Sequence, residues 1–271
     1  MTDPLIPAWF AITVTAVFGG LIGSFLNVVI WRLPRGMSVV HPRSACPVCK
    51  RPIAWYDNIP VLSYLVLRGR CRTCSTGISL RYPAVELLTA AAFAGVTIGA
   101  YQGVYPAAIL PLLLFWAAAG IALALIDLDH HRLPDAITLP AYIVSFVFIM
   151  LATALTGDLS RLLPALIGLI ALSGLYLLLA FGWREGMGLG DVKLAGSLGM
   201  TLGWFGWPQL IVGGFSAFIV GAIVGIALII ARRAGRKSGL PFGPFMLIGA
   251  AIGIFAGQPI AGFYLTLVGL A

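Results

Sequence analysis

The stretch Gly188-Leu189-Gly190-Asp191-Val192-Lys193 places a carboxylate at the mouth of a long apolar segment. Apolar runs lie on both sides of it, and the whole chain of 271 residues contains only nine acidic residues. An ionisable side chain at membrane depth is costly, which makes Asp191 a candidate functional residue. The alternative is a helix cap, because a carboxylate at a helix start accepts bonds from free N–H groups. Gly188 and Gly190 would let a substrate backbone approach closely, and Lys193 is counted with them as a substrate-supporting residue.

The composition predicts a membrane protein that crosses the bilayer several times. Hydrophobic residues make up 60% of the chain and charged residues 10%, whereas a soluble domain is about a quarter charged. The segment 32–82 differs from the rest, since it holds all four cysteines and nine of the 17 Lys and Arg residues. The net charge of +8 needs no nucleic-acid partner, because the excess of basic residues in cytoplasmic loops of membrane proteins explains it.

The apolar runs predict an all-α fold of about eight transmembrane helices. A run of about 20 apolar residues crosses a bilayer as a helix. The first run has no basic residues before it and arginines after it, so we interpret it as a retained helix and not as a signal peptide. We expect three parts: a first helix (1–31), a Cys-rich cytoplasmic loop domain (32–82) and a seven-helix membrane domain (83–271). The expected spans are 6–30, 84–101, 105–126, 137–156, 161–182, the glycine-rich 190–207, 208–231 and 243–269.

The basic residues also predict the orientation in the membrane. With the amino terminus outside, 16 of the 17 Lys and Arg residues fall on the cytoplasmic side, and Arg161 is the exception. This bias predicts that both termini are periplasmic and that the loop 32–82 is cytoplasmic. The count includes Arg184, Arg233, Arg236 and Lys237.

The cysteines form two pairs, Cys46-Pro47-Val48-Cys49 and Cys71-Arg72-Thr73-Cys74, separated by 21 residues. This spacing predicts one tetrahedral Zn²⁺ site with four thiolate ligands, and a site without an open position is structural. Two disulfides are the alternative, but they need an oxidising compartment. The basic residues beside the second pair are expected to face anionic lipid headgroups, with nucleic acid as the alternative; they are Arg68, Arg70 and Arg72.

A second carboxylate, Asp127, lies at the cytoplasmic end of the third predicted span, while Asp191 begins the sixth. The topology brings both to the same depth on the same face of the membrane. Two facing carboxylates can share a proton, so that one acts as base toward a water and the other as acid. Alternatives lie in the expected loop 128–135: Asp129, Asp135 as a helix cap, and a metal site with His130 and His131.

Together these motifs resemble the GxGD intramembrane aspartic proteases and, more widely, the bacterial type IV prepilin peptidases. The resemblance implies that Asp127 and Asp191 are the catalytic pair of an inner-membrane enzyme. It also implies cleavage of a basic leader after a glycine and methylation of the new amino terminus from S-adenosylmethionine. Shorter relatives lack the Cys-rich loop and only cleave. The motifs are 23–28, 32–34, the cysteine pairs, 58–60, 78–83, Glu86, 126–127, 133–135, 188–193 and 241–245.

The implied substrates are prepilins and pseudopilins, each with a basic leader joined to an apolar helix. Their scissile bond would lie at the cytoplasmic membrane interface, beside Asp127 and Asp191. Residues 241–244 are expected to form another wall of the site, because Gly243 tolerates unusual backbone angles. Asn27 and Glu86 are candidates to orient the amine or the methyl donor, and helix packing and capping are their alternative roles.

Two other functions fit parts of the sequence. Carboxylates among glycine-broken helices also occur in proton-coupled secondary transporters, although no internal repeat is evident here and both aspartates lie at one edge. A zinc-bearing assembly protein without enzymatic activity is the other alternative. Both alternatives predict that replacing the aspartates by asparagine leaves prepilin processing unchanged.

Overall fold

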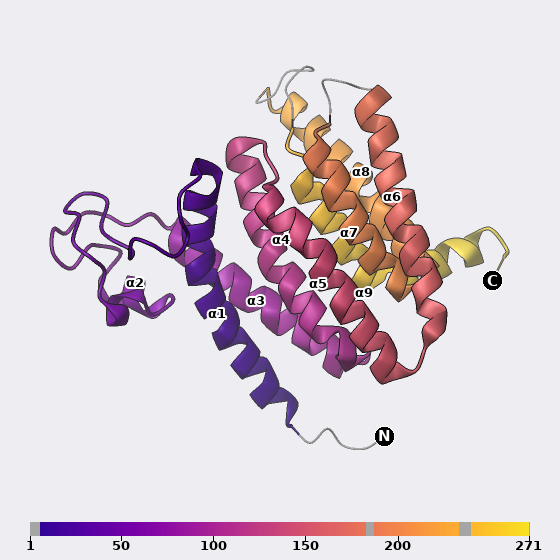
Figure 1. The fold of residues 1–271 in the computed structure, drawn as a ribbon, viewed down its shortest axis with the longest axis horizontal. Coiled ribbons are helices and arrows are strands. Elements are labelled where there is room, and N and C mark those ends of the chain that lie inside the picture. The colour runs from indigo at the N-terminus through magenta and orange to yellow at the C-terminus, as the bar shows by residue number, and fades with distance from the viewer. Residues whose placement is uncertain (1–5, 183–186, 233–239, 271) are drawn as a thin grey trace. The chain divides into compact units, whose positions relative to one another are not determined.

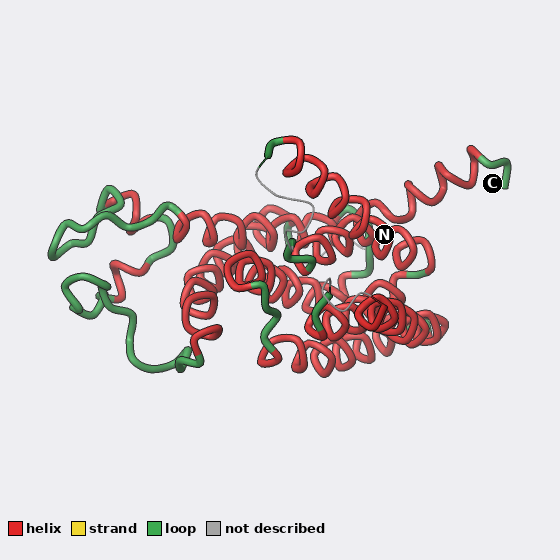
Figure 2. The backbone as a smooth tube through the Cα atoms, turned by 90° about the horizontal axis from the view of Figure 1, so that it is seen from above, coloured by secondary structure: helices red, strands yellow, loops and turns green. Residues whose placement is uncertain are grey.

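The computed structural model describes residues 6–182, 187–232 and 240–270, and within these ranges the chain forms helices joined by loops (Figures 1 and 2). Apart from two isolated β-bridges, these ranges contain no strand, so the prediction of an all-α fold is confirmed. The long helices are α1 (Ala8–Arg32), α3 (Arg81–Tyr101), α4 (Leu110–His130), α5 (Asp135–Thr156), α6 (Leu162–Gly182), α7 (Leu189–Phe205), α8 (Trp207–Ile230) and α9 (Gly243–Leu267). The shorter elements are α2 (Leu62–Val66), η1 (Leu33–Arg35), η2 (Trp55–Asn58), η3 (Ala107–Ile109) and η4 (Leu159–Arg161).

Seven helices in the described ranges are long and apolar enough to cross a membrane. They correspond to seven of the eight predicted spans, which confirms a multi-pass membrane protein. The remaining predicted span, 190–207, the sixth in chain order, is α7, a helix of 17 residues. Four of the residues used to predict the orientation lie outside the described residues; they are Arg184, Arg233, Arg236 and Lys237.

The turn between α4 and α5 is shorter than the sequence predicted. Helix α4 continues to His130, so Asp129 and His130 lie on the helix and not in a loop. The helix ends where His131 adopts a positive φ of 51°. Pro134 caps α5, because its carbonyl accepts bonds from the N–H groups of Ile137 and Thr138. Asp135 is therefore the first helical residue and not the cap.

The chain divides into two compact units, 1–122 and 123–271. In the first unit, α1 packs along α3 (Figure 1). Glycines on α1 allow this close approach, as is common between membrane helices. A Cβ atom added at Gly19 would lie 2.8 Å from the carbonyl oxygen of Thr89, and one added at Gly23 would lie 2.8 Å from the Cα atom of Glu86.

In the second unit, α7 packs against α5, α6, α8 and α9. Every residue from Leu194 to Trp204 is buried. Gly168 and Gly199 bring α6 and α7 together, since a Cβ atom on Gly199 would collide with the carbonyl oxygen of Gly168. The glycine-rich composition of 190–207 is thus explained by helix packing, because small residues let helix backbones approach closely.

Candidate active site

Asp127 lies in the last two turns of α4 and is buried, with 5% of its surface exposed. Its Oδ2 atom accepts a hydrogen bond of 3.0 Å from the backbone N–H of Gly243, the first residue of α9. A Cβ atom on residue 243 would lie 2.8 Å from that same oxygen. A side chain here would therefore press on the carboxyl group.

This contact gives a different reason for a glycine at position 243 from the one that the sequence suggested. The sequence predicted a residue that tolerates unusual backbone angles, but Gly243 is not among the residues with positive φ. It is the first residue of a helix, and its missing side chain allows the close approach of Asp127. The Pro241-Phe242-Gly243-Pro244 motif pointed to this segment, but only the fold shows that its N–H group faces Asp127.

Asp191 is the third residue of α7, and its Oδ2 atom accepts a bond of 3.1 Å from the N–H of Gly188. The capping contact that the sequence offered as an alternative is therefore present. It does not exclude a chemical role, because one carboxyl group has several acceptor positions. Asp191 is also close enough to Asp127 for the two carboxyl groups to interact electrostatically.

Leu133, in the turn between α4 and α5, lies against the glycines that accompany both carboxylates. A Cβ atom on Gly190 would lie 3.0 Å from Leu133 Cβ, and one on Gly243 would lie 3.0 Å from Leu133 Cδ2. The end of α4 and the starts of α7 and α9 are therefore neighbours. Gly188 has more room, since its nearest neighbour would be Asp191 Oδ2 at 3.7 Å.

Lys193 and Asp135 connect α7 to the start of α5. Lys193 Nζ lies 2.7 Å from Asp135 Oδ1, and both side chains are exposed. The hydroxyl of Tyr142 donates a bond of 2.7 Å to the backbone oxygen of Lys193. Asp135 thus has an ion-pair partner in the structure, and Lys193 is held next to the turn that carries Leu133.

The four cysteines come together in the first unit, with all four Sγ atoms within 4.8 Å of one another. The two loops have the same local form: a β-bridge flanks each pair, Ala45 with Pro52 and Arg70 with Gly77. The residue after each pair has a positive φ, 59° at Lys50 and 56° at Ser75. The turn that carries Cys46 and Cys49 and the turn that carries Cys71 and Cys74 thus direct their thiol groups toward the same place.

The cysteine cluster fits a tetrahedral Zn²⁺ ion. Zn–S bonds of about 2.3 Å place tetrahedral sulfurs about 3.8 Å apart, and Cys46 Sγ and Cys74 Sγ are separated by 3.7 Å. All four cysteines are free thiols. Their pKa values diverge: hydrogen bonds with Thr76 lower the pKa of Cys74 to about 6, whereas burial and the neighbouring thiols raise the pKa of Cys49 to about 11. In the described part of the chain this is the one group of His, Cys, Asp and Glu side chains arranged for a metal, and it does not include His130 or His131.

The two candidates for methyl-donor binding make structural contacts in the first unit. The Asn27 amide donates a bond of 3.1 Å to the backbone oxygen of Tyr82, which joins α1 to the start of α3. The buried carboxylate of Glu86 accepts a bond of 2.8 Å from the N–H of Val61, the residue that caps α2. These contacts agree with the packing and capping alternatives for Asn27 and Glu86.

Two family models match this chain. Residues 17–100 match the bacterial peptidase A24 N-terminal domain, and residues 112–230 match the type IV leader peptidase family. A prepilin leader peptidase/N-methyltransferase from Aeromonas hydrophila is 38% identical over 95% of this chain and 95% of its own length. A protein of the same description from Burkholderia pseudomallei (strain 1026b) is 36% identical over 97% of this chain and 90% of its own length. One from Pseudomonas aeruginosa is 35% identical over 94% of this chain and 93% of its own length. No solved structure matches.

The helical fold, with the buried Asp127 at the end of α4 and Asp191 at the start of α7, defines a multi-pass membrane protein with acidic groups at the ends of its helices, a class that contains both peptidases and transporters. The family models and the relatives described above decide between a peptidase and a transporter. The chain belongs to the type IV leader peptidase family, which confirms the resemblance found in the sequence. It is therefore an enzyme of the peptidase class, and the transporter alternative is not supported.

Proposed function

We propose that this chain is an aspartic endopeptidase that removes the leader from type IV prepilins and pseudopilins, with Asp127 and Asp191 as its catalytic pair. The single observation that carries the proposal is that Leu133 lies against Gly190, the neighbour of Asp191, and against Gly243, whose N–H group is bonded to Asp127. The two carboxyl groups, 64 residues apart in the sequence, are thereby brought to one end of the bundle formed by α4, α7 and α9. Two neighbouring carboxyl groups favour a shared proton, because their like charges repel.

In the proposed mechanism, the deprotonated member of the pair removes a proton from a water molecule. That water attacks the carbonyl carbon of the scissile peptide, while the protonated member donates its proton to the carbonyl oxygen. The resulting gem-diol then collapses: the C–N bond breaks, the carboxyl group that took the water's proton donates it to the leaving amine nitrogen, and the other carboxylate takes back a hydroxyl proton. The Gly243 N–H group, bonded to Asp127 Oδ2, fixes the orientation of one carboxyl group. Gly188 and Gly190 would let an extended substrate backbone run along the start of α7.

We propose further that Cys46, Cys49, Cys71 and Cys74 hold one structural Zn²⁺ ion, and that the enzyme methylates the new amino terminus from S-adenosylmethionine. The geometry of the thiols supports the first part, and the names of the relatives support the second. Zn²⁺ supplies no reaction step here, because four protein ligands leave no open position.

The proposed location is the bacterial inner membrane, with both termini periplasmic and the carboxylates at the cytoplasmic face. The distribution of Lys and Arg supports this orientation. It suits the substrate, because a prepilin places its basic leader in the cytoplasm and its apolar helix in the bilayer.

The decisive experiment measures leader cleavage by purified protein acting on a prepilin. We expect Asp127→Asn and Asp191→Asn to abolish cleavage, because an amide can neither activate the water nor exchange the shared proton. Asp129→Asn and Asp135→Asn are the matched controls on α4 and α5, and they should retain most of the activity. Near-normal turnover by Asp191→Asn would contradict the aspartic mechanism.

A further inference from the structure

Residues 55–66 of the Cys-rich loop form a compact segment of η2 and α2 with an unusual surface. It exposes several large apolar side chains, of which Trp55 is 81% and Val66 75% exposed. Soluble surfaces seldom gather so many apolar side chains without a partner. The exposed residues are Trp55, Tyr56, Ile59, Leu62, Leu65 and Val66.

The segment lies beside the middle of the first membrane helix and not beyond its end. A Cβ atom on Gly20 would lie 3.6 Å from the Cβ atom of Pro60, so Pro60 packs on α1 at this level. Gly20 precedes the basic end of α1, Arg32, by 12 residues. At 1.5 Å per residue this separation is about 18 Å along the helix, more than half of a hydrocarbon core of about 30 Å.

The end of α1 has the features of a membrane interface. Arg35 stacks over the ring of Trp31 at 3.7 Å, and Trp31 is exposed. Tryptophan and arginine in this arrangement are typical of the headgroup level. If Arg32 and Trp31 lie at the headgroups, Pro60 lies at the depth of the acyl chains.

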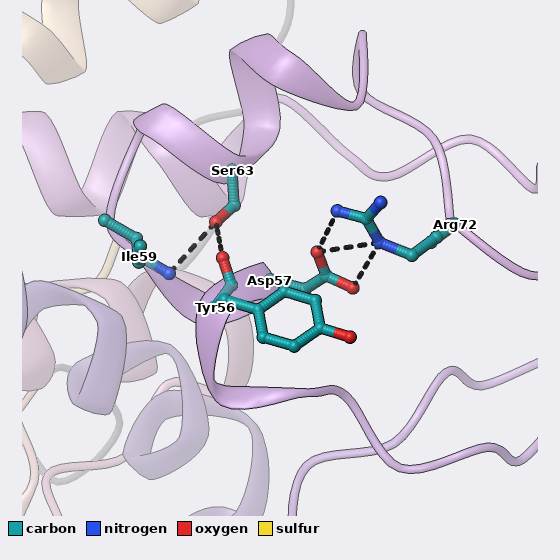
Figure 3. Close-up of polar contacts among 5 residues, drawn as sticks. All are labelled: Tyr56, Asp57, Ile59, Ser63 and Arg72. Carbon is teal, nitrogen blue, oxygen red and sulfur yellow. Dashed lines mark hydrogen bonds and ion pairs between the residues drawn. The ribbon is translucent and has the colours of Figure 1, made fainter.

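Several backbone polar groups of the segment have protein partners, as a lipid environment demands. The Ser63 hydroxyl accepts a bond from the N–H of Ile59 and donates one to the carbonyl oxygen of Tyr56 (Figure 3). Glu86 accepts the N–H of Val61 at 2.8 Å. Pro60 and Ile59 carbonyl groups accept further bonds from the start of α2.

The one acidic residue of the loop is neutralised. Asp57 receives three hydrogen bonds from the Arg72 guanidinium, the shortest 2.6 Å long (Figure 3). Residues 32–82 contain nine Lys and Arg against this single carboxylate. Such a loop repels a basic leader peptide and attracts anionic headgroups.

We propose that residues 55–66 insert into the lipid bilayer, with their apolar side chains among the acyl chains, and that Arg68 and Arg70 bind anionic headgroups beside them. The depth of Pro60, the backbone groups paired around it and the positive charge all favour lipid over a pilin as the partner. The loop is thus held at the membrane by lipid contacts in addition to α1 and α3. This inference does not depend on the catalytic roles proposed above.

The test uses the full-length protein in nanodiscs and places a tryptophan at either of two exposed valines of the loop. In a Trp55→Phe background, Val66→Trp reports on the proposed segment and Val40→Trp, 70% exposed in the native chain, is the matched control outside it. Subtracting the fluorescence of the Trp55→Phe protein leaves the fluorescence of the introduced tryptophan alone. We expect lipids brominated on their acyl chains to remove most of the Val66→Trp emission, and aqueous iodide to quench Val40→Trp preferentially.

Equal quenching of both reporters by iodide, with no effect of brominated lipid on Val66→Trp, would overturn the proposal. Protection of Val66→Trp from iodide only after a prepilin is added would also overturn it, since the surface would then be a pilin site. The difference in emission between the wild-type protein and Trp55→Phe reports on the native Trp55 side chain, so its quenching repeats the measurement without an introduced tryptophan.

The contact with anionic headgroups is tested with the double variant Arg68→Gln, Arg70→Gln. It should reduce bromolipid quenching of Val66→Trp in phosphatidylglycerol discs but not in phosphatidylcholine discs. No difference between the two lipids would refute the headgroup contact.

Discussion

At the scale of single residues, Gly243 offers the sharpest test of how Asp127 is positioned. In Gly243→Ala the new methyl group would lie 2.8 Å from Asp127 Oδ2 and 3.0 Å from Leu133 Cδ2. The carboxyl group must move, and displacing a reacting group by about 1 Å can cost on the order of 100-fold in rate. We expect a loss of this order in prepilin cleavage, measured as turnover by the purified variant.

Gly262→Ala is the control for this substitution. It makes the same chemical change on α9, at a position where a Cβ atom would meet nothing within 4 Å. It should cleave at the native rate, since alanine favours a helix over glycine. Equal losses in the two variants would show that α9 tolerates no added methyl group and that the contact with Asp127 is irrelevant.

The Asp57–Arg72 ion pair makes the stability of the folded loop 32–82 depend on pH. Hydrogen bonds from Arg72 hold the pKa of Asp57 below its usual range. A depressed carboxyl pKa stabilises the fold above the unfolded value of about 3.9, and this contribution is lost as the pH falls through the lower folded pKa. Arg72 is half exposed, so solvent screening keeps the stabilisation small.

The prediction is that Asp57→Asn makes the loop more sensitive to protease near neutral pH, and that the difference from the native protein narrows in acid. Limited proteolysis of residues 32–82 over a pH series measures this. Arg72→Gln should behave in the same way, and the double variant should add little to either single change. A difference that grows as the pH falls would contradict the assigned sign.

At the scale of elements, Glu86 ties the start of α3 to α2. Replacing it by alanine leaves the part-buried Val61 N–H without this partner, and the cost should lie near the lower end of the range of about 1–3 kcal/mol for an unsatisfied buried donor. Val61 also has a positive φ of 61°, a strained value for a β-branched residue. We therefore expect Glu86→Ala to lower the melting temperature and to release residues 55–66 to protease.

Glu86→Gln separates the capping role from a role in methyl transfer. The amide oxygen can still accept the Val61 N–H, so stability should stay near the native value. If capping is the whole role, methylation of a cleaved pilin by Glu86→Gln also stays near native. Native stability with lost methylation would show instead that the carboxylate itself orients the amine or the methyl donor.

At the scale of the whole molecule, the two compact units separate two sets of candidate residues. Asp127 and Asp191 both lie in the unit 123–271, whereas the four cysteines, Asn27 and Glu86 lie in the unit 1–122. We expect Cys46→Ser to release the metal and loosen the loop, since three thiolates hold Zn²⁺ less tightly than four. Cleavage should suffer less than methylation. Metal analysis and both activities on the same preparation measure this.

The complementary experiment supplies a pre-cleaved pilin and labelled S-adenosylmethionine to Asp191→Asn. Incorporation of the label at the pilin amino terminus is expected if the two reactions use separate sites. The native enzyme with the same pre-cleaved pilin is the control for substrate quality. If the label is lost whenever Asp191 is replaced, methylation needs the peptidase site as well.

The sequence by itself determined the membrane class, seven of the spans and the two motifs to which we assign the chemistry. Composition and run length suffice for the spans, because a helix must be apolar over about 20 residues to cross a bilayer. The spacing of Cys46, Cys49, Cys71 and Cys74 already indicates a four-ligand site, since each local turn brings two thiols together. Asp127 and Asp191 are conspicuous because charges are so rare in this chain.

Only the tertiary structure decided which helix faces meet. In a membrane protein, lipid-facing and buried residues are equally apolar, so hydrophobic periodicity does not identify the packed face. The N–H of Gly243 reaches Asp127 across 116 positions of sequence, and Leu133 lies against both Gly190 and Gly243. The packing of Pro60 against Gly20 is of the same kind. Each of these contacts depends on close approach between distant segments, which no local pattern encodes.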